Sequence, residues 1–471
     1  MGKKRKKNPN NEIMKITYVF IALFVAMIGY FVYFMVFQSR DVINNSYNKR
    51  QDSFTEKIVR GTIYASGGEE LAVTETDAEG NETRVYPFGN LFAHVIGINS
   101  HGRAGLELAY NFDLLTSNAD TVEKIFNEFK GVKNIGDNIS TTLEVGLQQA
   151  ASDALGTNRG VIVAMEPDTG KVLAMVSKPD YDPNLADTDW ASLSSDTEKA
   201  VLINRSTQGL YTPGSIFKIF TLLEYIRENP GYSDYAYDCN GSYTNGEYSV
   251  SCFNGKSHGH QNLMESFANS CNSSFVNIGL GLNLKSFRES CGSLLFNADL
   301  PIIIPYKRSS FTLNEDSGIF DVMQTSMGQG ETLVTPMHML MTVSAIANEG
   351  VLVTPRFVDR IESYTGNTVK TIRSQEYGNL ITSDEASVLK EYMRAVVTEG
   401  TASELKSDSY TAYGKTGTAQ VDSGDKAHSW FVGFAENGDK KIAICVLFEE
   451  MPSGTKWSVN AAKSVLDYYF R

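Results

Sequence analysis

The chain has 471 residues, of which 42% are hydrophobic and 21% are charged, so it is long enough for two or three globular domains with a large buried core. Its formal net charge is −13, and the acidic excess grows once the basic N-terminal stretch GKKRKK is set aside. A body this acidic argues against nucleic acid as a partner.

The first element that we expect is a transmembrane helix over residues 16–37, after a cytoplasmic tail of residues 1–15. As a helix with a rise of about 1.5 Å per residue, this uncharged apolar run is long enough to cross a hydrocarbon core of about 30 Å. A cleaved signal peptide is the alternative, but its apolar region would have about 7–15 residues and small residues at its end. Because basic residues dominate the tail, the positive-inside rule predicts a single-pass protein with a cytoplasmic N-terminus and an extracytoplasmic body.

Beyond the membrane we expect a small β-rich pedestal and linker over residues 38–150 and a main domain over residues 151–471. GDNISTTLEVGLQQAASDAL, a loop followed by an amphipathic helix, would join them. The main domain opens with a hairpin around Pro-Asp-Thr-Gly, carries a second hairpin around Asn437-Gly438 and closes with an apolar pattern at helical spacing. Strands at both ends with helices between them predict an α+β fold, in which helices pack on an antiparallel sheet.

The stretch GLYTPGSIFKIF places a Pro-Gly turn before Ser215 and a lysine, Lys218, three residues later. A serine at the start of a helix is usually an N-cap, and Ser-x-x-Lys occurs six times in the chain, so the pattern alone decides nothing. Two other stretches favour a catalytic role for Ser215 over a role as an N-cap. FANSCNSSF places Ser270 and Asn272 two residues apart, and AYGKTGTAQ contains the single Lys-Thr-Gly of the chain.

Acyl transfer to a serine needs a nearby base, donors for the developing oxyanion and groups that hold the substrate. Residues three apart share a helix face, so Lys218 would stand beside Ser215. Its ammonium, with an ordinary pKa of about 10.4, becomes a base only if burial or a second cation favours the neutral form. Lys415 is a candidate for that second cation and for binding an anionic substrate group.

Ser-x-x-Lys, Ser-x-Asn and Lys-Thr-Gly, in this order, resemble the signature shared by penicillin-binding proteins and class A β-lactamases. YTPGSIFK, HGHQNLMESFANSCN, TSMGQGETLVTPMHM and GKTGTAQ…HSWFVGFA resemble class B penicillin-binding proteins, and RGTIYASGGEELA and YPFGNLFAHVIGINSHGRAGLELAYNFDLL resemble their membrane-proximal segment. The likeness spans about residues 58–470 and is closest to the short penicillin-binding protein A type. The chain departs from the family at Cys271, where many relatives carry Asp or another residue, and lacks an Asp-Arg pair in RGTIYASGGEELA.

The resemblance implies a transpeptidase domain in which Ser215 is the nucleophile and Lys218 its proton acceptor. Ser270 would pass a proton to the leaving amine, and Asn272 would hold Lys218 and the amide of the substrate. No cofactor is implied.

The resemblance also implies that a substrate-binding strand contains Lys415, Thr416, Gly417 and Thr418. The lysine and the two threonine hydroxyls would receive the terminal carboxylate of a D-Ala-D-Ala stem peptide. The backbone N–H groups of Ser215 and Thr418 would form the oxyanion hole.

The family activity is peptidoglycan D,D-transpeptidation, which β-lactam antibiotics block by acylating the serine. Between the membrane run and the main domain there is too little chain for a glycosyltransferase domain, so the resemblance implies a SEDS-family glycosyltransferase as the membrane partner. A β-lactamase or D,D-carboxypeptidase is the enzymatic alternative, and a non-catalytic scaffold or sensor of cell-wall synthesis is the alternative of another class.

Five cysteines occur in the chain. Cys239 and Cys252 bracket a Gly/Tyr/Asn/Ser-rich loop, where they form either a disulfide or two free thiols. Cys445 alternates with apolar neighbours and is expected in the core. His258 and His260 have no cysteine or carboxylate at ligand spacing nearby, so we expect a structural loop there and no metal site.

Overall fold

The computed structural model describes residues 10–34, 55–421 and 426–471. Helix α1 (Asn10–Tyr33) contains a stretch, Ile13–Tyr33, that is long and apolar enough to cross a membrane. The apolar side chains of this stretch are exposed in the protein, as expected for a surface that contacts lipid. The parts of the predicted tail and transmembrane helix that fall on residues 1–9 and 35–37 lie outside the described residues.

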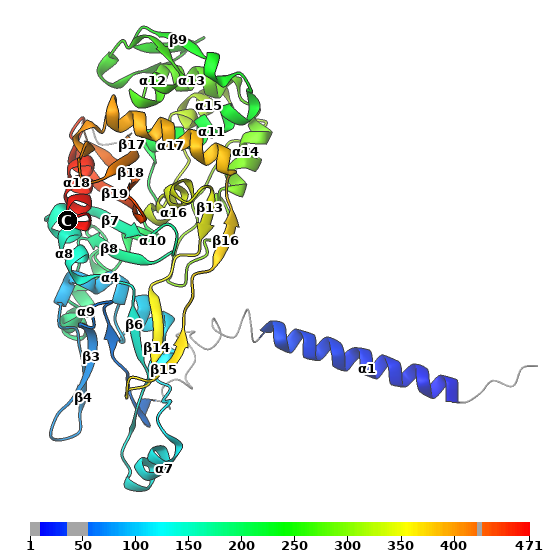
Figure 1. The fold of residues 1–471 in the computed structure, drawn as a ribbon, viewed down its shortest axis with the longest axis vertical. Coiled ribbons are helices and arrows are strands. Elements are labelled where there is room, and N and C mark those ends of the chain that lie inside the picture. The colour runs from blue at the N-terminus through cyan, green and yellow to red at the C-terminus, as the bar shows by residue number, and fades with distance from the viewer. Residues whose placement is uncertain (1–9, 35–54, 422–425) are drawn as a thin grey trace, which may run out of the picture.

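The central element is a five-stranded antiparallel sheet with the order β17-β18-β19-β7-β8 (Figure 1). Both predicted hairpins are confirmed, because β7 pairs with β8 and β18 with β19, and Gly170 and Gly438 adopt the positive φ that each turn needs. The strands are β7 (Gly160–Met165), β8 (Val172–Lys178), β17 (Thr411–Gln420), β18 (Lys426–Asn437) and β19 (Lys440–Pro452).

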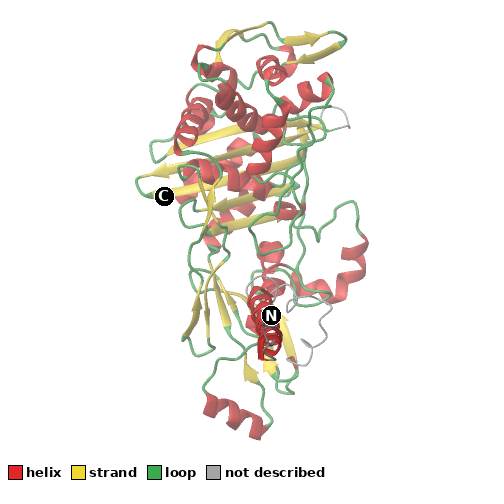
Figure 2. Cartoon of the chain, turned by 90° about the vertical axis from the view of Figure 1, so that its right-hand side faces the viewer, coloured by secondary structure: helices red, strands yellow, loops and turns green. Residues whose placement is uncertain are grey.

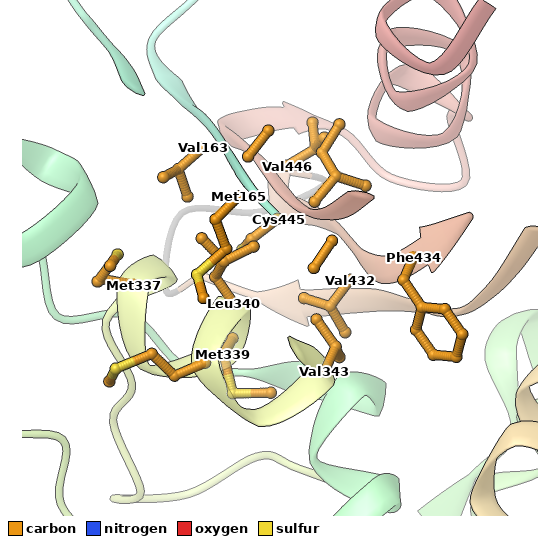
Figure 3. Packing of buried hydrophobic residues seen from close by; sticks show 14 of the residues in the cluster. Val163, Met165, Met337, Met339, Leu340, Val343, Val432, Phe434, Cys445 and Val446 are labelled. Atoms are coloured by element: carbon orange, nitrogen blue, oxygen red, sulfur yellow. The ribbon is translucent and has the colours of Figure 1, made fainter. Parts of the chain in front are cut away.

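Helices cover both faces of this sheet, which explains why every residue of β7 is buried. Helix α16 (Pro336–Ala347) is itself buried along its whole length and packs against β18, β19 and β7 (Figure 3). Helices α8 (Val145–Leu155) and the C-terminal α18 (Trp457–Tyr469) pack on each other and on the sheet. The predicted α+β fold and C-terminal helix are therefore confirmed.

A second, six-stranded sheet with the order β15-β14-β6-β2-β3-β4 forms the pedestal, and Figure 2 shows its strands as a separate group along the long axis. Its strands are β2 (Ile63–Tyr64), β3 (Glu70–Thr76), β4 (Glu82–Val85), β6 (Asn138–Thr141), β14 (Val358–Glu362) and β15 (Thr368–Thr371). Strand β6 lies in the predicted joining loop. Strands β14 and β15 come from far inside the predicted main domain, so this sheet is built from two separate stretches of the chain.

A small lobe of residues 236–262 lies at the other end of the molecule (Figure 1). It consists of two antiparallel pairs, β9 (Ala236–Cys239) with β12 (Gly259–Asn262) and β10 (Ser242–Asn245) with β11 (Tyr248–Ser251). Helices α12 (Leu263–Ala268) and α13 (Asn272–Gly281) follow and connect the lobe to the rest of the main domain.

Short elements complete the described chain. The strand pairs β1 (Ile58–Val59) with β5 (Asn134–Ile135) and β13 (Val351–Val353) with β16 (Glu376–Asn379) flank the pedestal sheet and α16. The remaining α-helices are α4 (Ala93–Ile96), α5 (Gly105–Ala109), α6 (Asn111–Leu114), α7 (Thr121–Lys130), α9 (Ala186–Ser195), α10 (Arg205–Gln208), α11 (Lys218–Glu228), α14 (Leu284–Ser293), α15 (Ile319–Ser326) and α17 (Ser383–Thr398).

Candidate active site

Ser215 lies in a 3₁₀ turn, Gly214–Phe217, that leads directly into α11. Pro213, and not Ser215, occupies the N-cap position, so the serine is not the capping residue. The turn is held from outside, because the Gly214 N–H donates a hydrogen bond to the Gly328 carbonyl at 2.8 Å. Gly214 has a φ of +56°, and a Cβ at this position would lie 2.6 Å from the carbonyl oxygen of Thr418, so only glycine lets the turn approach β17 this closely.

Lys218 follows Ser215 by one turn, and its side chain is fully buried. Its Nζ donates hydrogen bonds to the Ser270 carbonyl at 2.8 Å, to the Asn272 Oδ1 at 2.7 Å and, at 3.3 Å, to the Ser270 Oγ. Burial lowers the pKa of Lys218 from 10.5 to about 7. A lysine that is partly neutral near pH 7 can accept the proton of a neighbouring hydroxyl.

Lys415 enters the site from β17 and is also fully buried. Its Nζ donates hydrogen bonds to the Ser270 Oγ at 2.9 Å and to the Thr416 carbonyl at 3.1 Å. Burial, followed by the nearby charge of Lys218, holds the pKa of Lys415 well below its ordinary value. The two lysines therefore compete for positive charge, and a bound carboxylate would restore the charge of Lys415.

Ser270 and Asn272 lie at the junction of α12 and α13. Ser270 has a φ of +56°, a left-handed conformation that costs a non-glycine residue about 1 kcal/mol or more and that clusters at functional sites. Its hydroxyl lies between the two lysine ammonium groups. The Asn272 Nδ2 donates to the Ser251 carbonyl of β11 at 3.0 Å, which fixes the amide with its oxygen toward Lys218.

Strand β17 is the edge strand of the central sheet, so backbone groups on one of its sides are unpaired with another strand. The Thr418 carbonyl faces the Gly214 turn, and the N–H of a strand residue points to the same side as its carbonyl. The Thr418 N–H thus lies on the side of Ser215. A Cβ on Gly417 would approach the Ile216 Cγ2 to 2.9 Å, so this glycine permits the close contact of strand and turn.

The structure adds two residues that sequence reasoning did not assign to the site. The Thr401 Oγ1 lies 2.6 Å from the Thr416 Oγ1, so the Thr416 hydroxyl already has a protein partner. The Gln329 Nε2 donates to the Thr418 carbonyl at 3.5 Å. Gln329 lies between Gly328 and Gly330, and no local pattern marks Gln329 or Thr401 as a site residue.

Of the two alternatives that the sequence left open for Cys239 and Cys252, the structure has the free thiols. Cys239 and Cys252 are free thiols whose Sγ atoms lie 3.7 Å apart, so the disulfide is not formed in this structure. The expectation that no cysteine approaches His258 is wrong, since its Nδ1 lies 3.4 Å from the Cys239 Sγ. Pairing of β9 with β12 brings the two together, whereas His260 contacts Asp238.

This geometry suits acyl transfer through a serine ester, because a serine on a rigid turn has a partly neutral lysine one turn away and a second hydroxyl between two cations. Comparison with known proteins agrees. Residues 160–467 match the penicillin-binding protein transpeptidase domain, and residues 60–139 match the penicillin-binding protein A dimerisation domain. The chain belongs to the penicillin-binding protein transpeptidase family.

Individual relatives have a similar length and fold. The chain is 28% identical over 470 residues to the peptidoglycan D,D-transpeptidase PbpA of Mycolicibacterium smegmatis, covering 94% of each chain. It is similar to the D,D-transpeptidase domain of a peptidoglycan glycosyltransferase from Eggerthella lenta, with 27% identity, a TM-score of 0.78, and coverage of 87% of this chain and 97% of that one. The ceftriaxone acyl-enzyme complex of penicillin-binding protein A from Mycobacterium tuberculosis has 25% identity, a TM-score of 0.80 and coverage of 89% and 100%.

Proposed function

We propose that the protein is a peptidoglycan D,D-transpeptidase that cross-links stem peptides through an acyl-enzyme on Ser215. The observation that carries this proposal is the convergence of Lys218 and Lys415 on the Ser270 hydroxyl. Asn272 is bonded to Lys218, and Ser215 lies one turn before Lys218 in the chain. Relatives that bear the name D,D-transpeptidase, and the acyl-enzyme structure with a β-lactam, support it.

In the acylation step, neutral Lys218 takes the proton of the Ser215 hydroxyl while Oγ attacks the carbonyl carbon between the two D-Ala residues. The backbone N–H groups of Ser215 and Thr418 stabilise the oxyanion. The C–N bond then breaks, and the proton returns from Lys218 to the leaving amine by way of the Ser270 hydroxyl. In the second step the amine of a neighbouring stem peptide attacks the ester, loses its proton along the same route, and regenerates the free serine.

The terminal carboxylate of the donor peptide binds Lys415 and the Thr418 hydroxyl. Thr416 contributes less than the family pattern implies, because its hydroxyl is already bonded to Thr401. The edge of β17 offers backbone donors and acceptors on which an extended peptide can align as an added strand.

Helix α1 anchors the protein in the cell membrane as a single span, with the N-terminus in the cytoplasm and the catalytic domain outside. The membrane partner is a SEDS-family glycosyltransferase, which would supply the glycan strands that this enzyme cross-links. This assignment of orientation and partner rests on the charge of the N-terminal tail and on the resemblance to class B penicillin-binding proteins.

The test is intact-mass spectrometry of the full chain in detergent, incubated with benzylpenicillin and sampled over time. We expect a persistent adduct on the native protein and none on Ser215→Ala. Ser387→Ala is a matched control, because Ser387 opens another Ser-x-x-Lys pattern on the exposed side of α17 and should keep the adduct. Rapid return to unmodified protein would favour a β-lactamase or carboxypeptidase, and no adduct at any time would favour a non-catalytic scaffold.

A further inference from the structure

Helix α7 of the pedestal turns its apolar side away from the protein. Its apolar residues follow the spacing i, i+3, i+4 and i+7, which places them on one side of a helix: Val122, Ile125, Phe126 and Phe129. In a globular protein such a side faces the core. In α7 no side chain is buried by the described residues, and Phe129 is 88% exposed. These four residues, the α7 face, are therefore packed in the reverse of the usual way.

The polar side of α7 holds the helix on the pedestal. Glu123 accepts a hydrogen bond from the hydroxyl of Tyr364, which lies in the loop between β14 and β15. The Asn127 Nδ2 donates to the Asn134 Oδ1 of β5 at 3.0 Å. Glu123, Lys124 and Asn127 are half-buried, whereas every residue of the α7 face is exposed. Polar contacts thus fix the orientation of the helix with its apolar side outward.

Both ends of α7 are capped, so the sequence specifies a helix at this place. The Asp120 side chain accepts a hydrogen bond from the Val122 N–H at 2.8 Å, and Gly131 ends the helix with a left-handed φ of +64°. A helix of ten residues is marginal in water without packing. The α7 face therefore needs an apolar partner that the described residues do not supply.

The chain that leaves the membrane span joins the pedestal beside α7. Strand β1 pairs with β5, which begins four residues after α7 ends, and the Lys133 Nζ donates to the Thr55 carbonyl at 2.7 Å. The 20 residues 35–54 separate this point from the described part of α1 and can span at most about 70 Å. Helix α7 and the lobe of residues 236–262 lie at opposite ends of the molecule (Figure 1). The α7 face is therefore at the tethered end of the protein.

A lipid surface suits the α7 face better than a protein partner does. Specific protein interfaces use about 20–30 residues from each side, and this face has only four. An interfacial helix needs an apolar side that enters the headgroup region and basic side chains beside it. The Lys130 Nζ lies 4.9 Å from the centre of the Phe126 ring, so its stem lies along the apolar side while its ammonium can reach the headgroups.

We propose that α7 lies in the membrane surface, with the α7 face at the boundary between lipid headgroups and acyl chains. This proposal rests on the anchoring of the chain by α1, which is part of the proposed function. The tether keeps the bilayer within reach of the pedestal, so a weak contact suffices. With a second point of attachment the pedestal does not swing about its tether, and the active site keeps one height above the membrane.

The test is depth-dependent fluorescence quenching of the full chain in vesicles of equal parts phosphatidylglycerol and phosphatidylethanolamine. Phe129→Trp places a probe on the α7 face, and the native chain, with its three tryptophans, gives the background. An interfacial helix lies about 5–10 Å into the headgroup boundary. Lipids brominated near the headgroup end of the acyl chain should therefore quench the probe more strongly than lipids brominated near the methyl end. Phe253→Trp, at an exposed phenylalanine of the lobe, is the matched control and should not be quenched by either lipid.

Aqueous iodide separates the outcomes. We expect it to quench Phe253→Trp and to spare Phe129→Trp. Quenching of Phe129→Trp by iodide and not by bromine would place the α7 face in water and overturn the proposal. Protection from both quenchers would mean that protein covers it, either a second copy or residues 35–54, and would overturn the proposal as well. Ile125→Trp, on the same face, should repeat the result if one substitution disturbs the helix.

Two further readouts keep the proposal apart from the proposed function. Flotation of the protein with the vesicles reports the anchoring by α1, whatever the position of α7. Ser215→Ala combined with Phe129→Trp should lose the penicillin adduct and keep the lipid quenching. Loss of the quenching with the adduct intact would contradict only the place of α7.

Discussion

The central sheet and the lobe of residues 236–262 both contact residues of the active site, and they have different interiors. The sheet is built around large apolar side chains such as Trp430 and Phe434, both fully buried. The lobe is built around thiols. Lys415 lies on β17, and the turn that contains Ser215 packs against that strand, whereas Asn272 is bonded to Ser251 of the lobe. The two halves of one site should therefore fail under different perturbations.

The largest effect is expected from Lys218→Met, which keeps the buried volume and removes the base. Acylation by a fluorescent penicillin should fall by about 10²- to 10⁴-fold, the usual contribution of general base catalysis. In the native protein the acylation rate should rise with pH and level off above about 7, since only neutral Lys218 accepts a proton. Lys390→Met is the control, because it removes a lysine that forms an ion pair with Glu436. A variant that acylates at the native rate would exclude Lys218 as the base.

Next in size is Phe434→Ala, which tests the apolar region. Removing this fully buried ring should lower the free energy of unfolding by about 3–5 kcal/mol, measured by denaturant titration. Tyr248→Ala, in the exposed β10–β11 hairpin of the lobe, should change it by no more than about 0.5–1 kcal/mol. Equal losses of unfolding free energy in Phe434→Ala and Tyr248→Ala would mean that the two regions do not differ in the way that their interiors suggest.

Gly328→Ala tests how the loop after α15 supports the turn that contains Ser215. Gly328 has a φ of +88°, and a Cβ there would lie 1.8 Å from the Gly214 carbonyl, so the turn that carries Ser215 must move. We expect acylation to fall about tenfold or more, as misplaced reacting groups cost about 10²-fold in other enzymes. Gly246→Ala also has a positive φ but meets nothing within 4 Å, so it should leave the acylation rate unchanged.

The smallest effect is expected from Thr401→Val, which removes the partner of the Thr416 hydroxyl without a large change in volume. One hydrogen bond contributes about 1 kcal/mol, so the second-order acylation constant should change by no more than about fivefold. Thermal unfolding should be nearly unchanged. A loss as large as that of Lys218→Met would mean that Thr401 itself contacts the substrate.

The sequence predicted what is local and missed what depends on distant pairing. The two hairpins and the C-terminal helix follow from turn residues and apolar spacing, and they are confirmed. The proximity of Lys218 to Ser215 follows from helical spacing. The places of Ser270, Asn272 and Lys415 beside it came only from family resemblance, because they are 52 or more residues away along the chain.

Three features carried no local signal. The contact of His258 with Cys239 depends on the register of β9 with β12, in which Gly259 faces Cys239. The bond from Thr401 to Thr416 joins a loop to a strand. The return of β14 to the pedestal pairs it with β6, more than 200 residues earlier, and apolar alternation within a strand does not specify so distant a neighbour.

That return of the chain also governs how the gene for such a protein can change. Strand β14 is an inner strand of the pedestal sheet, between β15 and β6, yet it is encoded between two stretches of the catalytic domain. Suppose that recombination near residue 150 joined the first part of one relative to the second part of another. The pedestal sheet of the product would then contain strands from both relatives. A working exchange of pedestals therefore needs two segments, one before α8 and one that carries β14 and β15.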